Sequence, residues 1–365
     1  MAPLAVTPPL LNSANPWCTT LEQLQELYDC AYTGAITTRT SLLNGFPNDP
    51  AVHQFAFYDP TRHTASSPNV DQGGNPNETG SLNTLGYSPI LLEEYLGFIK
   101  TISQGLPPHP AGGKEHFKPV IISVTGSAED VVACYKLITS YQRDVRMVLA
   151  MEINLSCPNI PGKPPPAYDA SSLSTYLDAL KVEIDRQISE DGTSAHPHTG
   201  HTHVPIGIKT PPYTYQDQYN GLIKALKDSA LAQPAHLPCP ITFITSCNTL
   251  GSSLLLAPQL ESSSDGHSHE VYHRTLESAT GTGIGGLAGA PLHPLALGNV
   301  YTIKGLLFQH KELEHIQIIG VGGVDDAAGY RRMRAVGAAA VGVGTALGRH
   351  GVKIFGEIEK GVSTK

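Results

Sequence analysis

The sequence contains no long uninterrupted apolar segment, no run of basic residues and no feature that marks a secreted chain. A transmembrane helix needs roughly 20 consecutive apolar residues, so we expect no membrane span. The amino-terminal segment lacks basic residues and its apolar residues are interrupted by prolines, which argues against a signal or transit peptide. With 32 acidic against 24 basic residues and a net charge of −8, nucleic acid and anionic membranes are poor partners.

Cysteine pairs with the spacing of a zinc site or a disulfide framework are also absent. The six cysteines are scattered over 365 residues, at positions 18, 30, 134, 157, 239 and 247. This distribution indicates reduced thiols in a cytoplasmic protein. Four histidines at positions 196, 198, 201 and 203 alternate with small residues, but no acidic residue or cysteine lies among them. A solvated loop is therefore favoured over a metal tract, and no metal site is expected.

Short β-branched and apolar runs alternate with helical patterns along the chain. Capping boxes at Thr19/Glu22 and Ser127/Asp130 mark the expected starts of two helices. Eight runs are predicted to be strands, at 10–13, 34–38, 119–124, 148–155, 205–209, 241–246, 316–321 and 339–343. This alternation is typical of an α/β fold of the (β/α)8 (TIM) barrel type. A doubly wound open sheet is the alternative, but no G-x-G-x-x-G motif follows the first strand.

Three polar segments interrupt this pattern, at about 44–78, 191–203 and 258–273. Loops of this length inside a compact domain are usually functional or mobile. We therefore expect one barrel domain over residues 1–365 that carries three long inserted loops.

The segment 152–164, with the sequence EINLSCPNIPGKP, joins an apolar strand to a turn rich in Pro and Gly. It places the thiol of Cys157 between the carboxamides of Asn154 and Asn159 at the predicted strand end. A cysteine can take a proton, and flanking amides offer donors and acceptors to a flat polar ring. The alternative is a buried cysteine beside two turn-forming asparagines.

Small, amide or cationic residues also follow the other predicted strands. In a barrel the carboxyl ends of the strands converge on one face, where catalytic residues collect. These strand-end residues are Asn12, Ser13, Ala14, Asn15, Thr38, Arg39, Thr40, Lys209, Asn248, Thr249, Gly322, Gly323, Gly344 and Thr345. Their recurrence predicts one composite site.

Glycine-rich segments follow the seventh and eighth predicted strands, at 320–323 and 342–345, and a third lies at 283–289. Loops after these two strands are the usual phosphate site of a barrel, although tight turns would also require glycine. Lys209 lies inside an apolar strand, where an unpaired lysine is costly to bury. The N1/O2 edge of a flavin is a fitting partner for this cation.

The segment 152–164 resembles the catalytic loop of the class 1A dihydroorotate dehydrogenases, in which N-L-S-C-P-N is followed by P-G-K-P. The resemblance extends from about Leu10 to about Gly356. It implies an FMN-dependent oxidoreductase that converts (S)-dihydroorotate to orotate in de novo pyrimidine (UMP) biosynthesis. It also implies a soluble electron acceptor such as fumarate, and a homodimer.

The same resemblance suggests the role of each site residue. Cys157 would remove the C5 proton while hydride leaves C6 for the flavin, with Lys209 and Arg39 beside it. The substrate would be bound by Asn83, Leu85, Gly86, Tyr87, Asn154, Asn159, Asn248 and Thr249. The FMN would be held by Ser13, Ala14, Thr38, Arg39, Asn154, Lys209, Gly286, Gly322, Gly323, Gly344 and Thr345.

Two positions depart from the family pattern. Arg39 stands where the family has lysine, and it keeps the charge but not the size or donor geometry. Asn15 replaces a glycine near the flavin. Two alternatives therefore stay open: a related flavoenzyme acting on another dihydropyrimidine, and a barrel that binds a phosphate ligand without redox chemistry. A structural or interaction protein would leave the polar strand ends without a purpose.

Overall fold

The eight predicted strands form a single parallel sheet. A computed structural model describes residues 3–71, 75–108, 117–155, 165–191, 203–262 and 267–364. In spatial order the sheet runs β1-β14-β13-β8-β7-β6-β5-β2. These strands are β1 (Leu10–Asn12), β2 (Ile36–Thr37), β5 (Val120–Val124), β6 (Leu149–Asn154), β7 (Ile206–Lys209), β8 (Ile241–Ser246), β13 (Gln317–Val321) and β14 (Ala340–Val343).

The barrel closes between β1 and the short strand β2. Leu11 and Ala35 form a parallel bridge between the two segments. The side chain of Asn12 then extends the pairing, because its oxygen accepts from the Thr37 amide at 2.9 Å and its nitrogen donates to the Thr37 carbonyl at 2.7 Å. The (β/α)8 prediction is confirmed, and the open sheet is wrong since closure leaves no free edge between these strands.

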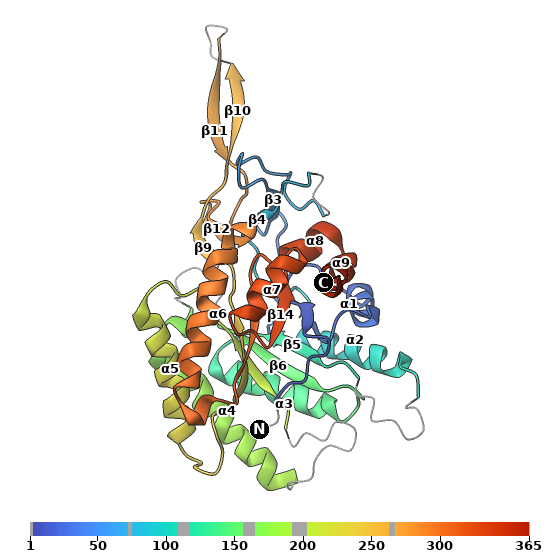
Figure 1. Ribbon diagram of the computed structural model, residues 1–365, viewed down its shortest axis with the longest axis vertical. Helices are drawn as coiled ribbons and strands as arrows, with labels where there is room; N and C mark the ends of the chain where they lie inside the picture. Colours follow the sequence, from blue (N-terminus) through green and yellow to red (C-terminus); the bar gives the residue numbers. More distant parts are fainter. Residues whose placement is uncertain are drawn as a thin grey trace.

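The helices surround the barrel, as Figure 1 shows. They are α1 (Leu21–Asp29), α2 (Leu92–Gly105), α3 (Ala128–Gln142), α4 (Ala170–Asp191), α5 (Gln216–Leu231), α6 (His293–Phe308), α7 (Ala327–Ala335), α8 (Thr345–His350) and α9 (Lys353–Ser363), with short 3-10 turns at Pro166–Tyr168, Ala290–Leu292 and Lys311–Leu313. Leu177 and Leu180 of α4 and Leu222 of α5 are buried, as their helical spacing predicts.

The two predicted capping boxes have different outcomes. Ser127 caps α3 and Asp130 completes the box, as expected. The start of α1 lies one residue later than predicted, because Thr20 accepts from the amide of Gln23 and the Gln23 side chain bonds back. Among the helices that the structure describes, none combines the length and apolar character needed to cross a bilayer.

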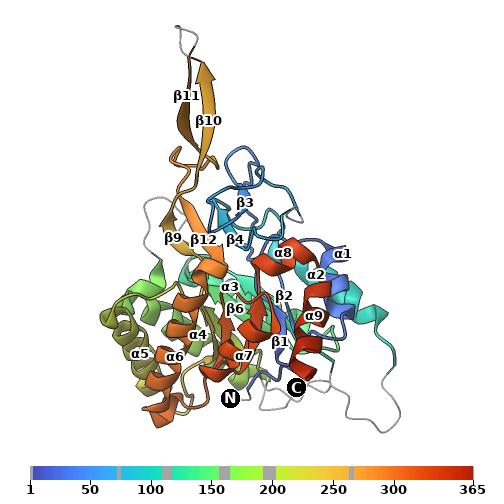
Figure 2. The same ribbon diagram turned by 45° about the horizontal axis from the view of Figure 1, so that its top comes forward.

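A second, antiparallel sheet covers one end of the barrel (Figure 2). Its strands, in the order β3-β4-β12-β9, are β3 (Phe55–Tyr58), β4 (Gly80–Asn83), β12 (Gly285–Gly289) and β9 (Leu250–Ser253). The hairpin of β10 (Leu256–Ser262) and β11 (Ser268–Arg274) projects beyond this sheet. The segment 44–78 therefore contains a strand, and the described residues of 258–273 belong to the hairpin. Residues 192–202 lie outside the described residues.

Candidate active site

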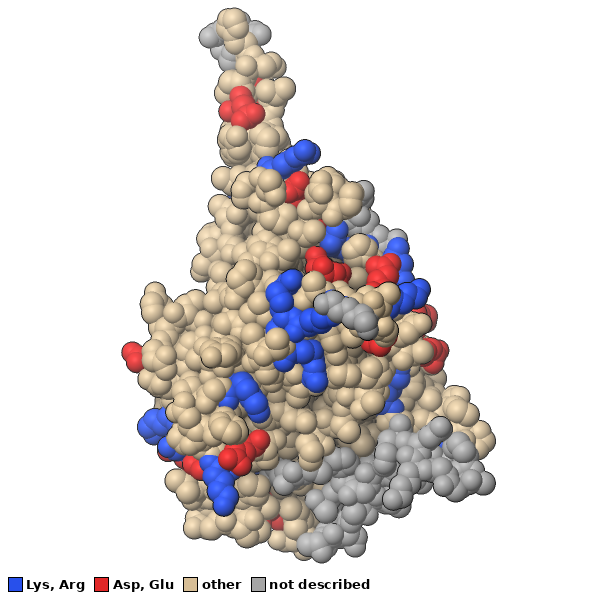
Figure 3. All heavy atoms as spheres, in the orientation of Figure 1, with Lys and Arg blue, Asp and Glu red and all other residues tan. Residues whose placement is uncertain are grey.

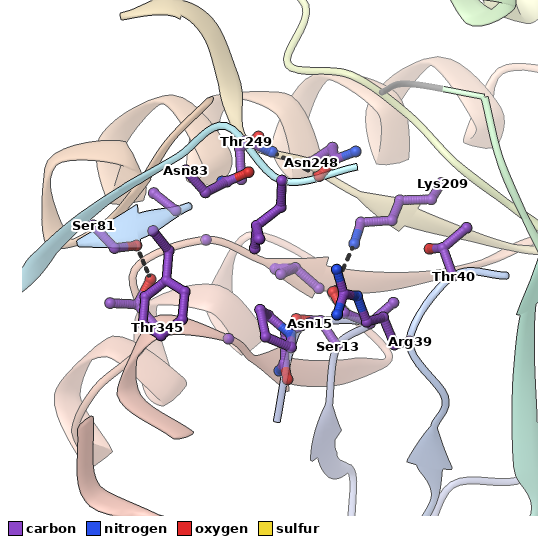
Figure 4. A pocket seen from close by; sticks show the side chains of 18 of the residues that line it. Ser13, Asn15, Arg39, Thr40, Ser81, Asn83, Lys209, Asn248, Thr249 and Thr345 are labelled. Atoms are coloured by element: carbon purple, nitrogen blue, oxygen red, sulfur yellow. Dashed lines mark hydrogen bonds between the residues drawn. The ribbon is translucent and has the colours of Figure 1, made fainter. Parts of the chain in front are cut away.

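A cavity lies at the carboxyl ends of the barrel strands, between the barrel and the small sheet. It encloses about 1040 Å³ of empty space, part of it open to solvent. Figure 4 shows side chains from barrel strand ends facing side chains from β4 across this space. Predicted site residues that line it are Ser13, Ala14, Arg39, Asn83, Leu85, Gly86, Tyr87, Asn154, Lys209, Asn248, Thr249, Gly322, Gly323, Gly344 and Thr345.

Two predicted residues lie behind this wall. Thr38 is fully buried, and its hydroxyl accepts a hydrogen bond of 3.1 Å from the Ser123 amide. The carbonyl of Gly286 accepts from the Asn83 side chain at 3.1 Å, so Gly286 supports the wall rather than facing the cavity. Cys157 and Asn159 lie outside the described residues, directly after the end of β6.

A chain of hydrogen bonds holds the polar wall of the cavity. The amide nitrogen of Asn154 donates to the Thr40 hydroxyl at 3.1 Å. Asn248 donates to the Asn154 oxygen at 3.3 Å, and its own oxygen accepts from the Thr249 amide at 2.9 Å. Side chains that are oriented in advance can recognise a flat polar ligand with little loss of conformational entropy.

Two cations, Arg39 and Lys209, point into the same space (Figure 4). Arg39 donates to the carbonyls of Tyr87 and Gly86 at 3.3 and 3.5 Å, and Lys209 donates to the Ala14 carbonyl at 3.4 Å. Within the described residues, neither cation has a carboxylate within 4.0 Å. Burial lowers the pKa of Arg39, but a guanidinium stays protonated in proteins. The pair therefore favours an anionic or electron-rich ligand.

The two described cysteines close to this site are poor bases. Cys247 lines the cavity, and the Cys18 carbonyl accepts from the Arg39 amide at 3.0 Å. Burial raises the pKa of each thiol to about 12, so both stay protonated near neutral pH. The described part of the chain thus places no thiolate here.

An aromatic wall was not predicted from the sequence. Trp17 and Phe55 line the cavity, and Trp17 stacks on Phe57 with ring centroids 5.7 Å apart. The Trp17 indole also donates to the Asp71 carboxylate at 2.6 Å. Alternating Phe55 and Phe57 could have indicated a strand, but this short run lies inside a polar segment.

The glycine loops have the conformations that close approach requires. Gly322 and Gly323 have φ of +137° and +66°. A Cβ on Gly323 would lie 2.5 Å from the Gly289 carbonyl oxygen. The Thr345 hydroxyl lies 2.8 Å from the Ser81 hydroxyl, which ties the loop after β14 to β4. Backbone amides in such loops can approach an anion without steric hindrance.

A closed (β/α)8 barrel whose strand ends converge on a polar, cationic cavity is the arrangement of a barrel enzyme. The family model of dihydroorotate dehydrogenase matches residues 65–365 of this chain. The chain belongs to the dihydroorotate dehydrogenase family and is an oxidoreductase. Membership of this family implies a flavin cofactor.

The relatives are similar over nearly the whole chain. Dihydroorotate dehydrogenase A (fumarate) of Lactococcus lactis subsp. cremoris is 27% identical over 353 residues, which covers 96% of this chain and 88% of the relative. Dihydroorotate dehydrogenase (fumarate) of Saccharomyces cerevisiae is 25% identical over 358 residues, with coverage of 96% and 87%. The crystal structure of a ligand-free dihydroorotate dehydrogenase from Eimeria tenella matches this fold with a TM-score of 0.64 at 15% identity. The match covers 97% of this chain and 83% of that one, and it supports the fold.

Proposed function

We propose that the protein oxidises (S)-dihydroorotate to orotate with one FMN, as a step of UMP biosynthesis, and passes the electrons to fumarate or another soluble acceptor. The observation that carries this proposal is the combination of a buried and a half-buried cation, Lys209 and Arg39, with a pre-oriented set of amides in one cavity. The relatives named fumarate-type dihydroorotate dehydrogenases support the substrate and the acceptor.

The cavity fits this substrate by its chemistry. Dihydroorotate carries ring amide groups and a carboxylate. Asn83, Asn154, Asn248 and Thr249 would donate to and accept from the ring, and Arg39 would bind the carboxylate through charge-assisted hydrogen bonds.

The cavity also fits a flavin mononucleotide. The loops containing Gly323 and Gly344 would hold its phosphate, Ser13 and Ala14 would lie along its ring system, and Lys209 would face its electron-rich edge. Bound FMN would supply the acceptor for the hydride that leaves C6 of the substrate.

Cys157 is the proposed base for the C5 proton. It follows β6 by three residues, and the thiols of Cys18 and Cys247 are held protonated by burial. A base acting near neutral pH therefore has to come from outside these two groups.

A related dihydropyrimidine is the second candidate substrate, and Arg39 is the observation that favours it. A guanidinium is larger and more planar than the family's ammonium group. It donates to the carbonyls of Gly86 and Tyr87, two of the residues proposed to bind the substrate.

The proposal includes a cytoplasmic location and a homodimer of single-domain chains over 1–365. The five described cysteines are free thiols, which supports a reducing compartment. The dimer follows from the resemblance to class 1A enzymes, and light scattering of the purified protein measures it.

One spectroscopic experiment tests cofactor and substrate together. The purified protein should release about one FMN per chain on denaturation. Anaerobic addition of dihydroorotate should bleach the flavin absorbance, whereas dihydrouracil, which lacks the carboxylate, should not. Bleaching by dihydrouracil alone would favour the second candidate, and a colourless protein that takes up no flavin would contradict both.

A further inference from the structure

Arg349, at the end of α8, is a buried cation that none of the roles above uses. The residue is only 8% exposed, and its Nε atom has no hydrogen-bond partner among the described residues. One terminal nitrogen donates to the Pro76 carbonyl at 2.8 Å. Burying a guanidinium with an unpaired N–H donor lowers the stability of the fold. We therefore expect a bound anion to pair with this group.

The surroundings of Arg349 show where that anion would lie. Arg349 lines a small cavity beside the main one. The two cavities share four lining residues, all from the glycine loops or the loop joined to them: Gly289, Gly323, Gly344 and Thr345. Arg349 therefore lies beside the end of the site that the glycine loops after β13 and β14 form.

We propose that Arg349 is the charged ligand of the flavin's phosphate group, an inference that rests on the proposed function. A phosphate carries close to two negative charges at neutral pH. The backbone amides of the glycine loops are electrically neutral, so they provide no positive charge to balance it. A guanidinium meets phosphate oxygens with two parallel N–H groups, which adds both charge and directionality.

Two carboxylates compete for the same cation. Asp325 lines the small cavity with Arg349, and Glu78 lies near the guanidinium. Burial and the neighbouring Asp326 raise the pKa of Asp325, and Arg349 lowers it. Within the described residues, neither carboxylate comes within 4.0 Å of Arg349. Arg349 thus lies near these acids but forms no ion pair with either of them, so its charge can interact with a bound anion.

The segment 75–79 contributes to this arrangement. Pro76 supplies the carbonyl that orients Arg349, and Thr79 lines the small cavity. This part of the long polar segment therefore contacts both Arg349 and the proposed phosphate end of the site.

The test compares FMN with riboflavin, which has the same ring system without the phosphate. Flavin-free wild-type protein and the Arg349→Met variant are titrated with each flavin, and binding is followed by quenching of flavin fluorescence. The variant should bind FMN about 10- to 100-fold more weakly, the usual effect of losing a charge-assisted hydrogen bond. Its riboflavin affinity should stay within about twofold of wild type.

Matched variants separate charge from packing. Arg334→Met removes a guanidinium from α7 that donates to the carbonyls of Ala338 and Ala339, outside both cavities, and should change neither affinity. Figure 3 shows basic side chains gathered over α7 on this face. Arg334 is an exposed residue of α7, so the control removes a positive charge from the surface of that helix. Asp325→Asn removes the competing negative charge and should leave FMN binding unchanged or tighter. If Arg349→Met does not fold, Arg349→Gln keeps a donor for the Pro76 carbonyl, and the same loss is expected.

The outcomes also separate this inference from the proposed function. Equal loss of FMN and riboflavin affinity in the Arg349 variants would show a packing role and overturn the inference. Unchanged FMN affinity would overturn it as well, while wild-type protein reduced by dihydroorotate would still support the proposed function. Wild-type protein that binds neither flavin would contradict the proposed function itself.

Discussion

The carboxyl group of Glu152 accepts a hydrogen bond of 2.6 Å from the Thr245 hydroxyl inside the barrel. Its other oxygen accepts from Ser123 at 3.0 Å, and the Ser123 hydroxyl lies 2.9 Å from that of Thr40. Thr40 in turn accepts from Asn154, which lines the cavity. The orientation of a proposed substrate-binding amide thus depends on an acid in the barrel core.

Glu152→Ala should therefore weaken both the fold and the substrate site. Two buried hydroxyls lose their acceptor, which costs about 1–3 kcal/mol of the free energy of unfolding. Dihydroorotate affinity should fall by roughly 10-fold, equivalent to about 1.4 kcal/mol. Urea unfolding and the substrate dependence of flavin reduction measure the two effects. Glu314→Ala, which changes an exposed acid, is the control. Equal stability and equal dihydroorotate affinity in the two variants would contradict the role of the hydrogen bonds from Glu152 to Asn154.

Arg39 provides a second test, of the carboxylate contact. Arg39→Lys should remain active because it keeps the positive charge in the cavity. Arg39→Ala should lose about 10- to 150-fold in dihydroorotate affinity or rate, which corresponds to about 1.5–3 kcal/mol. Steady-state kinetics of the three proteins measure the change. Wild-type kinetics in the alanine variant would assign the carboxylate to another residue.

The glycine loop after β13 should tolerate no side chain. Gly323→Ala forces a Cβ to within 2.5 Å of the Gly289 carbonyl oxygen at a φ of +66°. FMN affinity should fall by at least about 10-fold, because the loop would have to leave its binding conformation to relieve a strain of about 1–3 kcal/mol. Gly344→Ala is a graded comparison, since its Cβ would meet only the Ser13 hydroxyl at 3.2 Å. Equilibrium dialysis with FMN should rank the two variants in that order.

The periodic parts of the fold were predictable from the sequence, and the parts fixed by distant contacts were not. All eight barrel strands were predicted because buried parallel strands are short, continuous apolar runs. The strand β3 was missed because its position depends on Trp17 packing against Phe55 and Phe57. Arg349 was missed because an arginine near a helix end is usually an exposed capping cation, and only the fold shows its burial.

The pH dependence of flavin reduction tests Cys157. A free thiol has a pKa of about 8.5, and its thiolate is the proton acceptor. Flavin reduction by dihydroorotate should therefore accelerate as the pH rises toward that value. The thiols of Cys18 and Cys247 do not titrate in this range, because burial raises their pKa to about 12. A rise in the rate of flavin reduction centred near pH 8.5 would therefore come from a different thiol.

Cys157→Ala should abolish that rise and slow anaerobic flavin reduction by about 10²- to 10⁴-fold, the usual contribution of a positioned base. FMN should stay bound, since no cofactor contact is assigned to this thiol. Cys157→Ser should be intermediate, because a hydroxyl is a far weaker acid in the same place. Cys134→Ala, in the buried face of α3, is the control and should keep the wild-type pH profile. Stopped-flow reduction across a pH series measures these rates. A wild-type rate in Cys157→Ala would show that another group is the base. That group would be neither Cys18 nor Cys247, because burial keeps both thiols protonated.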